Sequence, residues 1–328
     1  MTKHISGTWF EFFHANLNES THINDACKSF TAEQWREKVR EIRGTGQEYL
    51  VIGNVGSETE NFEKLGTTEA FYETDLRPHY AMACKNPLEP VMDEAAKCGM
   101  KVFMASGSFS DIYGNMQKPG EQEVEFKAMG ELVEKFGHHK SFYGWYFPYE
   151  AWINDKFNDE YIDYINKYCD VAKSLNKDYK TLIAPFGTCN PKSEDAFTKQ
   201  LEHFDVDIIA YQDEVGVCKA TVDELPRIYE VLKRCHDKAG RSALWADAEI
   251  FAFEGEPYKT ALIPAPSSRV IGQLEAISPY VDKILVYQYQ GMMSKPGGSA
   301  FVGVESAGKL YTDYMDWMRA NHADKLPG

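Results

Sequence analysis

Two glutamates follow aromatic, strand-like runs of this sequence. Glu150 ends "GWYFPYE" (144–150), and Glu249 lies near the end of "ALWADAEIF" (243–251). A buried Glu is rare unless another group pairs with it, so each carboxyl belongs either to the rim of a core or to a reacting site. A pair of carboxyls suits glycoside hydrolysis, because one protonates the leaving oxygen while the other attacks the sugar or activates water.

Other residues at the ends of apolar runs could contact a sugar or support the two glutamates. Asp213 ends "VDIIAYQD" (206–213), and we assign it a supporting catalytic role. The residues that we predict to contact substrate are Glu11, His14, Asn54, Tyr149, Trp152, Gln212, Phe251 and Tyr289. Apolar surroundings would also raise the pKa of a carboxylic acid, as a general acid requires. For Tyr149, Trp152 and Phe251, core packing is an equally good interpretation.

Eight apolar runs along the chain must position these residues, and we interpret each run as a strand. They lie at 5–13, 48–55, 100–106, 142–150, 180–187, 206–213, 243–251 and 283–290. Most are nearly continuously apolar, which is typical of strands buried on both faces. Amphipathic segments separate them, and the first opens with a capping-box pair, Thr31 and Gln34, and ends at Gly44. The alternation predicts a single (βα)8 TIM barrel over residues 1–328.

The lengths of the connections indicate which end of the barrel carries the site. Three joins that follow strands are long, at about 14–30, 55–87 and 252–267, whereas the joins that precede strands are short. Active sites of such barrels lie among the loops that follow the strands, so we expect these three loops to wall the site. The alternative fold, an open doubly wound sheet, needs a glycine-rich turn after the first strand. The sequence there is "FFHANLNES" (12–20) instead.

Composition and charge exclude several classes of partner. The 328 residues include 35 Lys and Arg against 50 Asp and Glu, a formal net charge of −15. Such a charge repels phosphate, so neither nucleic acid nor an anionic membrane surface is an expected partner. No apolar run reaches 18 residues, so we expect no membrane span. A carbohydrate remains compatible, and no cofactor is implied.

The cysteines and the N-terminus leave the compartment open. Seven cysteines form no CxxC pair, and we interpret most of them as buried thiols rather than disulfides or zinc ligands. No signal peptide is visible. The chain would therefore be periplasmic or cell-surface if an export signal has been trimmed, and cytoplasmic otherwise. The oligomeric state also stays open.

The placement of the two glutamates resembles that of the clan A glycoside hydrolases, which are retaining enzymes built on (βα)8 barrels. In that clan the acid/base ends strand four and the nucleophile ends strand seven, which implies those roles for Glu150 and Glu249. The chain resembles more closely an uncharacterised bacterial family of glycoside-hydrolase-like barrels, domain of unknown function 4434. The matching stretches are "SGTWFEFF", "GWYFPYE", "APFG", "AYQDEVGV" and "LWADAEIF". One departure is Tyr149, because clan A usually places Asn before the acid/base, so the assignment of Glu150 rests on position alone.

The combined prediction is a retaining glycosidase that acts on a neutral or weakly charged oligo- or polysaccharide. We expect the two carboxyls to lie about 5–5.5 Å apart, with Glu150 in the more apolar surroundings. A non-catalytic glycan-binding barrel is an alternative, since the same aromatic residues would bind sugar. A metal-dependent sugar isomerase or epimerase is a further alternative, but it needs a His ligand, and no His ends strands four to eight. We therefore expect no metal.

Overall fold

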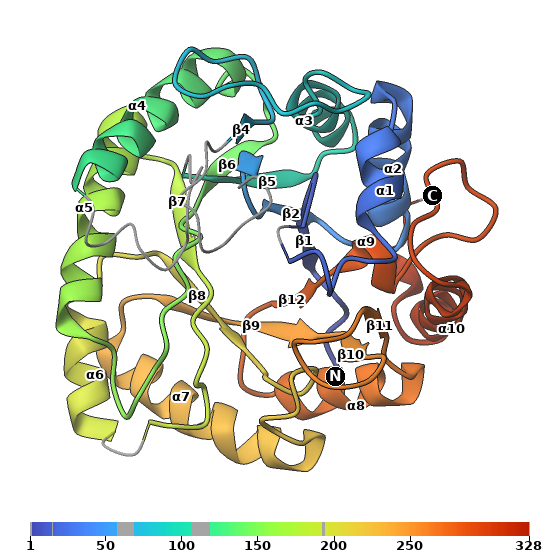
Figure 1. Ribbon diagram of the computed structural model, residues 1–328. Coiled ribbons are helices and arrows are strands. Elements are labelled where there is room, and N and C mark those ends of the chain that lie inside the picture. The colour runs from blue at the N-terminus through green and yellow to red at the C-terminus, as the bar shows by residue number, and fades with distance from the viewer. Residues whose placement is uncertain (1, 15, 58–68, 107–118, 192–193, 328) are drawn as a thin grey trace.

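The computed structural model describes residues 2–14, 16–57, 69–106, 119–191 and 194–327, and its centre is a closed barrel of eight parallel strands (Figure 1). In order around the barrel the strands are β1 (Gly7–Phe10), β2 (Tyr49–Ile52), β5 (Lys101–Ala105), β6 (Phe142–Tyr146), β7 (Lys180–Ile183), β8 (Ile208–Gln212), β9 (Ala243–Glu249) and β12 (Ile284–Tyr287). Each lies inside a predicted strand run. The predicted (βα)8 TIM barrel is therefore confirmed.

Helices surround the barrel as an outer ring (Figure 1). They are α2 (Ala32–Gly44), α3 (Leu88–Lys97), α4 (Pro119–Phe136), α5 (Asp159–Leu175), α6 (Glu194–Glu202), α7 (Leu225–Ala239), α8 (Ser267–Ile277) and α10 (Glu305–Asn321), with two short additions, α1 (Asn24–Ser29) and α9 (Tyr289–Met292). The predicted capping box of α2 is present, because the Thr31 hydroxyl accepts from the Gln34 N–H and the Gln34 amide oxygen accepts from the Thr31 N–H. Among the described residues, no helix is both long and apolar enough for a membrane crossing.

The core has two layers because successive strand side chains point to opposite faces of the sheet. The layer inside the barrel consists of Trp9, Tyr49, Val51, Phe103, Tyr146, Leu182, Ala184, Ile208, Ala210, Trp245 and Leu285. The other layer packs between the strands and the helices, and Trp145 belongs to it. Inward-facing positions continue toward the carboxyl ends of the strands. Glu11 follows Trp9 by two residues. Asp247 and Glu249 follow Trp245 by two and by four residues.

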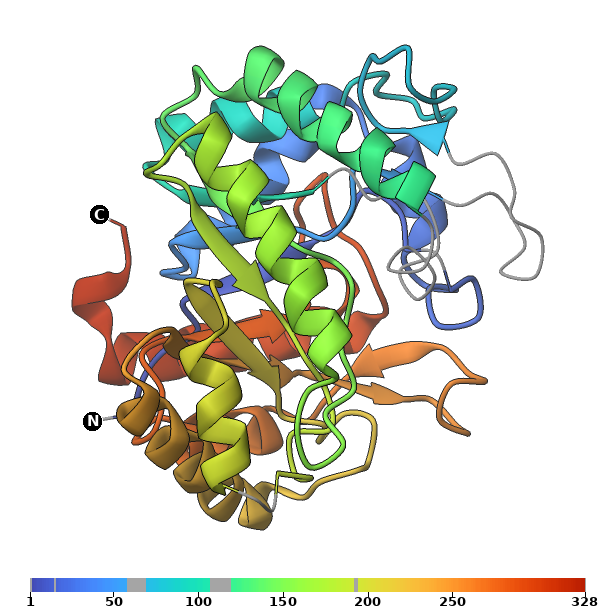
Figure 2. The same ribbon diagram turned by 90° about the vertical axis from the view of Figure 1, so that its left-hand side faces the viewer.

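Two small hairpins interrupt the long loops, and the sequence patterns did not predict them. β10 (Phe251–Phe253) pairs with β11 (Leu262–Pro264), and β3 (Gly56–Ser57) pairs with β4 (Glu69–Ala70). The β10–β11 hairpin projects from the end of the barrel opposite to the chain termini (Figure 2). It is tied to the loop after β1 by a hydrogen bond from the Leu262 N–H to the Glu19 carbonyl, at 2.9 Å. Residues 58–68 of the expected loop 55–87 lie outside the described residues.

All seven cysteines are free, as predicted, but fewer are buried than predicted. Cys27, Cys169 and Cys235 are buried, and Cys84 and Cys98 are half-buried. Cys189 and Cys218 are exposed on loops that follow β7 and β8. The sequence patterns did not separate these two from the core thiols, because the loops that carry them are themselves rich in apolar residues.

Gly144 allows β6 and β7 to approach each other closely. It is paired with Lys180 across the two strands, and a Cβ atom at position 144 would lie 2.0 Å from the Lys180 carbonyl oxygen. We expect Gly144→Ala to lower the free energy of unfolding by about 1–3 kcal/mol or more, because the backbone of β7 would have to move. Urea unfolding measures this change.

The control is Gly130→Ala in α4, where an added Cβ meets no atom within 4 Å. That variant should be neutral or stabilised by up to about 1 kcal/mol, since Ala is the better helix former. Equal stability of the two variants would contradict the close packing of β6 on β7.

Candidate active site

Glu11, His14 and Tyr287 form a hydrogen-bonded cluster at the mouth of the barrel. Nδ1 of His14 lies 2.9 Å from Oε2 of Glu11, and the Tyr287 hydroxyl donates to the same oxygen at 3.1 Å. The Glu11 side chain lies against Gly53, where a Cβ would approach its Cγ to 3.3 Å. We call these three residues the mouth cluster. They come from the ends of β1 and β12, which are neighbours in the barrel.

His14 carries a positive charge within this cluster. Its Nε2 lies 3.3 Å from Oε2 of Glu19, so the ring contacts a carboxylate on each side. Burial alone would lower the pKa of His14, but Glu11 and Glu19 outweigh burial and raise this pKa to about 10. Asn24 fixes the segment by accepting from the His14 N–H and donating to its carbonyl. The imidazolium is therefore a fixed hydrogen-bond donor near neutral pH.

Glu150 lies half-buried, four residues beyond the end of β6. Burial raises the pKa of Glu150 to about 7, and the charge of Glu11 adds to this effect. Hydrogen bonding with the Gln212 amide and the charge of His14 partly oppose the shift in pKa. A carboxyl group with such a pKa is partly protonated at neutral pH, as a general acid must be.

Glu249 is the last residue of β9, and three side chains form hydrogen bonds with its backbone. Its N–H donates to Oδ1 of Asp213 at 3.1 Å. Its carbonyl accepts from Nε2 of Gln273 at 3.1 Å and from the Arg269 guanidinium at 2.8 Å. The carboxylate in turn accepts from the Val217 N–H at 2.8 Å. This network fixes both the position of Glu249 and the direction of its side chain.

Asp213 supports Glu249 through the backbone. Its Oδ1 also accepts from the Val215 N–H at 3.1 Å, and its Oδ2 accepts from Gln273 at 2.6 Å. These partners place the Asp213 carboxyl between the strand ends and α8, on the outer side of the sheet. Burial raises the pKa of Glu249, and the nearby Asp213 carboxyl raises it further. Burial likewise raises the pKa of Asp213, to about 6.

The surroundings of the two glutamates differ from the expectation for the pair. The sequence predicted the more apolar surroundings for Glu150, yet Glu249 is only 3% exposed and Glu150 is half-buried. The reason is the loop after β8, whose Gly216 lies close enough to Glu249 that an added Cβ would approach the Glu249 Cβ to 2.8 Å. The predicted carboxyl separation of about 5–5.5 Å stays a prediction.

Asp247 is a site residue that the sequence analysis missed. It faces into the barrel, is 4% exposed, and its Oδ1 has no protein hydrogen-bond partner. Burial raises the pKa of Asp247 well above its usual value, and the charges of Glu249, Asp213 and Glu150 add to this effect, in that order. Asp247 therefore lies within electrostatic reach of both glutamates. Its position two residues before Glu249 on an alternating strand was the signal that could have identified it.

The other residues predicted to contact substrate lie partly at the mouth of the barrel and partly in the core. Gln212 ends β8 and donates to the Ala184 carbonyl at 3.1 Å, and Asn54 has a buried Oδ1 without a protein partner. Trp152 is 57% exposed. Tyr289 is fully buried, on Tyr311 and under the Lys38 ammonium. Tyr149 is half-buried and packs on Tyr161 and Tyr164, and Phe251 packs on Phe253 and on Tyr287 of the mouth cluster. Their contacts with substrate stay predictions.

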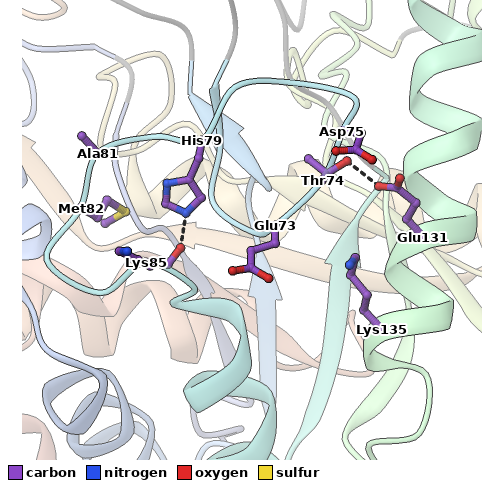
Figure 3. A pocket seen from close by; sticks show the side chains of 9 residues that line it. All are labelled: Glu73, Thr74, Asp75, His79, Ala81, Met82, Lys85, Glu131 and Lys135. Atoms are coloured by element: carbon purple, nitrogen blue, oxygen red, sulfur yellow. Dashed lines mark hydrogen bonds between the residues drawn. The ribbon is translucent and has the colours of Figure 1, made fainter.

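A separate hollow of about 710 Å³ lies away from these residues, between the loop after β2 and helix α4 (Figure 3). It is lined by Glu73, Thr74, Asp75, His79, Ala81, Met82, Lys85, Glu131 and Lys135. The Thr74 hydroxyl donates to Oε2 of Glu131 at 2.6 Å, which joins the loop to the helix. None of the predicted site residues contributes to this hollow. Within the described ranges, no group of three or more His, Cys, Asp or Glu side chains could hold a metal ion.

The raised pKa of Glu150 makes stability depend on pH. The folded protein binds this proton more tightly than the unfolded chain does, so the stabilisation is complete below about pH 4.5 and is lost as the pH rises toward 7. Glu150→Gln removes this dependence. We expect the melting temperature of the variant, relative to wild type, to be higher at pH 8 than at pH 5 by roughly 2 °C or more.

Differential scanning fluorimetry at the two pH values measures this difference. Glu275→Gln, a change on the exposed face of α8, is the matched control. Its melting temperature relative to wild type should be the same at both pH values. A Glu150→Gln variant whose relative melting temperature is the same at pH 5 and pH 8 would show that the Glu150 pKa is not raised.

Comparisons with known proteins agree with this architecture. The structure of a protein described as a putative alpha-L-fucosidase, from Bacteroides thetaiotaomicron VPI-5482, is similar over 97% of this chain and 94% of its own, at 18% identity and a TM-score of 0.72. The endo-beta-1,4-mannanase from Thermotoga petrophila is similar over 100% of this chain and 78% of its own, at 9% identity and a TM-score of 0.62. At such identities the similarity establishes a shared fold.

A further similar structure is the GH2 beta-galacturonidase from Eisenbergiella tayi bound to galacturonate, at 13% identity and a TM-score of 0.58. The similarity spans 96% of this chain and 51% of that one. No match was found among curated proteins. The family model described as Domain of unknown function (DUF4434) matches residues 5–300. The chain therefore belongs to the DUF4434 family.

Proposed function

We propose that this chain is a retaining glycoside hydrolase, with Glu150 as acid/base and Glu249 as nucleophile. The observation that carries the proposal is the pair of carboxyls beyond β6 and at the end of β9: the first has the pKa of a general acid, and the second is held in place by hydrogen bonds. Burial gives Glu150 a pKa of about 7, and hydrogen bonds to its backbone and carboxylate fix Glu249. The three similar barrels named above are described as a fucosidase, a galacturonidase and a mannanase, which supports the same class of reaction.

In the proposed reaction, the Glu249 carboxylate attacks the anomeric carbon while Glu150 gives its proton to the leaving oxygen. The bond to the leaving group breaks and a glycosyl ester forms on Glu249. Glu150, now a carboxylate, takes a proton from water, and the water oxygen attacks the same carbon and releases Glu249. The product keeps the anomeric configuration of the substrate. Asp213 and Gln273 act as positioning residues for Glu249.

The mouth cluster is the proposed recognition site for the hydroxyls of the sugar that is transferred. The His14 imidazolium is a donor, the Glu11 carboxylate is an acceptor, and the Tyr287 hydroxyl can serve as either. Asn54 and Gln212 add amide groups at the ends of β2 and β8. Several fixed polar groups of this kind suit a deep sugar subsite, because each sugar hydroxyl that leaves water needs a new partner.

A non-catalytic glycan-binding barrel is the second candidate function. One observation favours it: Glu249 is only 3% exposed, and its carboxylate already accepts from the Val217 N–H. A binding protein would need no access to this carboxylate. Turnover separates the two candidates, because a binding barrel releases no product from any substrate.

The test is a screen of aryl glycosides and of gut and plant polysaccharides, followed by two variants on the best substrate. Glu150→Gln should lower kcat/KM by about 10²–10⁴ for a sugar leaving group and much less for an activated aryl leaving group, which needs little protonation. Glu249→Gln should abolish turnover of both substrates, because no glycosyl ester can form.

The exposed Glu275→Gln change again serves as the control and should leave both rates at the wild-type level. Full activity of either site variant would remove that residue from the mechanism. Absence of any released product across the screen, together with measurable glycan binding, would favour the binding barrel.

A further inference from the structure

Two exposed aromatic side chains flank the site. Among the described residues, the exposed large apolar side chains are Leu17 at 54%, Trp152 at 57% and Tyr258 at 49%. Trp152 lies in the loop after β6, and Tyr258 lies in the turn of the β10–β11 hairpin. Large aromatic side chains are usually buried, so exposed rings beside a site are candidates for ligand stacking.

The Trp152 ring is held in place even though its surface is exposed. The loops after β6 and β7 are joined by hydrogen bonds from the Ile153 N–H to the Phe186 carbonyl at 2.8 Å and from the Phe186 N–H to the Ala151 carbonyl at 3.0 Å. Gly187 has a φ of 77°, and a Cβ there would lie 2.7 Å from Cδ1 of Trp152. The indole thus packs against a backbone that only glycine provides, and binding needs little further ordering of the side chain.

Lys219 extends the surface from Trp152 toward Tyr258. Its ammonium lies 5.3 Å from the ring centre of Phe186 and 5.9 Å from that of Tyr258. We call Trp152, Phe186, Lys219 and Tyr258 the aromatic rim. The ammonium is also 3.8 Å from Oε1 of Glu214, whose charge offsets its own. The rim therefore has no excess positive charge and suits a neutral ring rather than an anionic one.

The rim borders the proposed catalytic pair at both ends. Trp152 follows Glu150 by two residues. At the other end, Lys219 contacts the Tyr258 ring and follows Val217 by two residues, and the Val217 N–H donates to the Glu249 carboxylate at 2.8 Å. The mouth cluster, by contrast, is polar and mostly buried, with 13–15% of the His14 and Glu11 side chains exposed. The site thus offers one deep polar subsite and one exposed aromatic subsite.

We propose that the aromatic rim binds the leaving-group sugar, and that the substrate is an oligo- or polysaccharide cleaved between two neutral pyranose units. This inference rests on the proposed function. An acid/base must lie beside the leaving oxygen, so the loop that carries Glu150 and Trp152 must lie beside the leaving group. The apolar face of a pyranose can stack on the indole, while the Lys219 ammonium and the Tyr258 hydroxyl can bond its hydroxyls.

The test compares two substrates that share the transferred sugar and differ in the leaving group. One is the oligosaccharide that the wild-type enzyme cleaves, and the other is the glycosyl fluoride of the same sugar, whose leaving group has no ring. Trp152→Ala should lower kcat/KM for the oligosaccharide by about tenfold or more and leave the fluoride within about twofold of wild type. Trp152→Phe should restore most of the loss, because it restores a ring.

Leu17→Ala is the matched control, since Leu17 is as exposed as Trp152 but lies outside the rim. It should match wild type on both substrates. If Trp152→Ala lowered kcat/KM equally for the oligosaccharide and the fluoride, or for neither, the leaving-group subsite would be overturned. The proposed hydrolase function would be unaffected by that result. Failure of the wild-type protein to cleave any glycoside would instead remove the proposed function, and this inference with it.

Discussion

The alternation of side chains in a closed parallel barrel determines where the polar groups of the mouth can lie. The interior is filled by large residues such as Trp9, Tyr146 and Trp245, so it has no room for solvated carboxyls. Polar inward-facing positions are therefore confined to the carboxyl ends of the strands. Glu11, Gln212, Asp247 and Tyr287 follow this rule, and Glu249 occupies the next inward position along β9.

Crowding several carboxyls at one mouth is unfavourable unless hydrogen bonds or opposite charges offset it. The structure uses both devices. His14 is charged and lies between Glu11 and Glu19, whereas Asp213 and Glu249 accept mainly from amide groups. Burial then raises the pKa of Glu150, Asp213, Asp247 and Glu249. The same desolvation that reduces stability at high pH is what makes a carboxyl useful as a proton donor near neutral pH.

The strand runs and the capping box of α2 could be predicted, because apolar continuity indicates buried strands and the capping pair is local in the sequence. Side-chain direction at strand ends could not be predicted with the same success. Tyr289 was expected near substrate, but it is fully buried beneath Lys38. The mouth cluster and the hydrogen bonds that fix Glu249 join residues far apart in sequence, such as Glu11 with Tyr287 and Asp213 with Gln273. No local sequence pattern predicts such contacts.

The central claim is that Glu249 becomes glycosylated while Glu150 handles the proton. The most direct measurement is to trap the intermediate with an activated 2-deoxy-2-fluoro glycoside of the transferred sugar and to locate the label by peptide mass spectrometry. A single label on Glu249, formed at a similar rate but released more slowly in Glu150→Gln and absent in Glu249→Gln, is the predicted result. A label on Glu11 or Asp247, or rapid turnover of the parent substrate with inversion of the anomeric configuration, would contradict the claim.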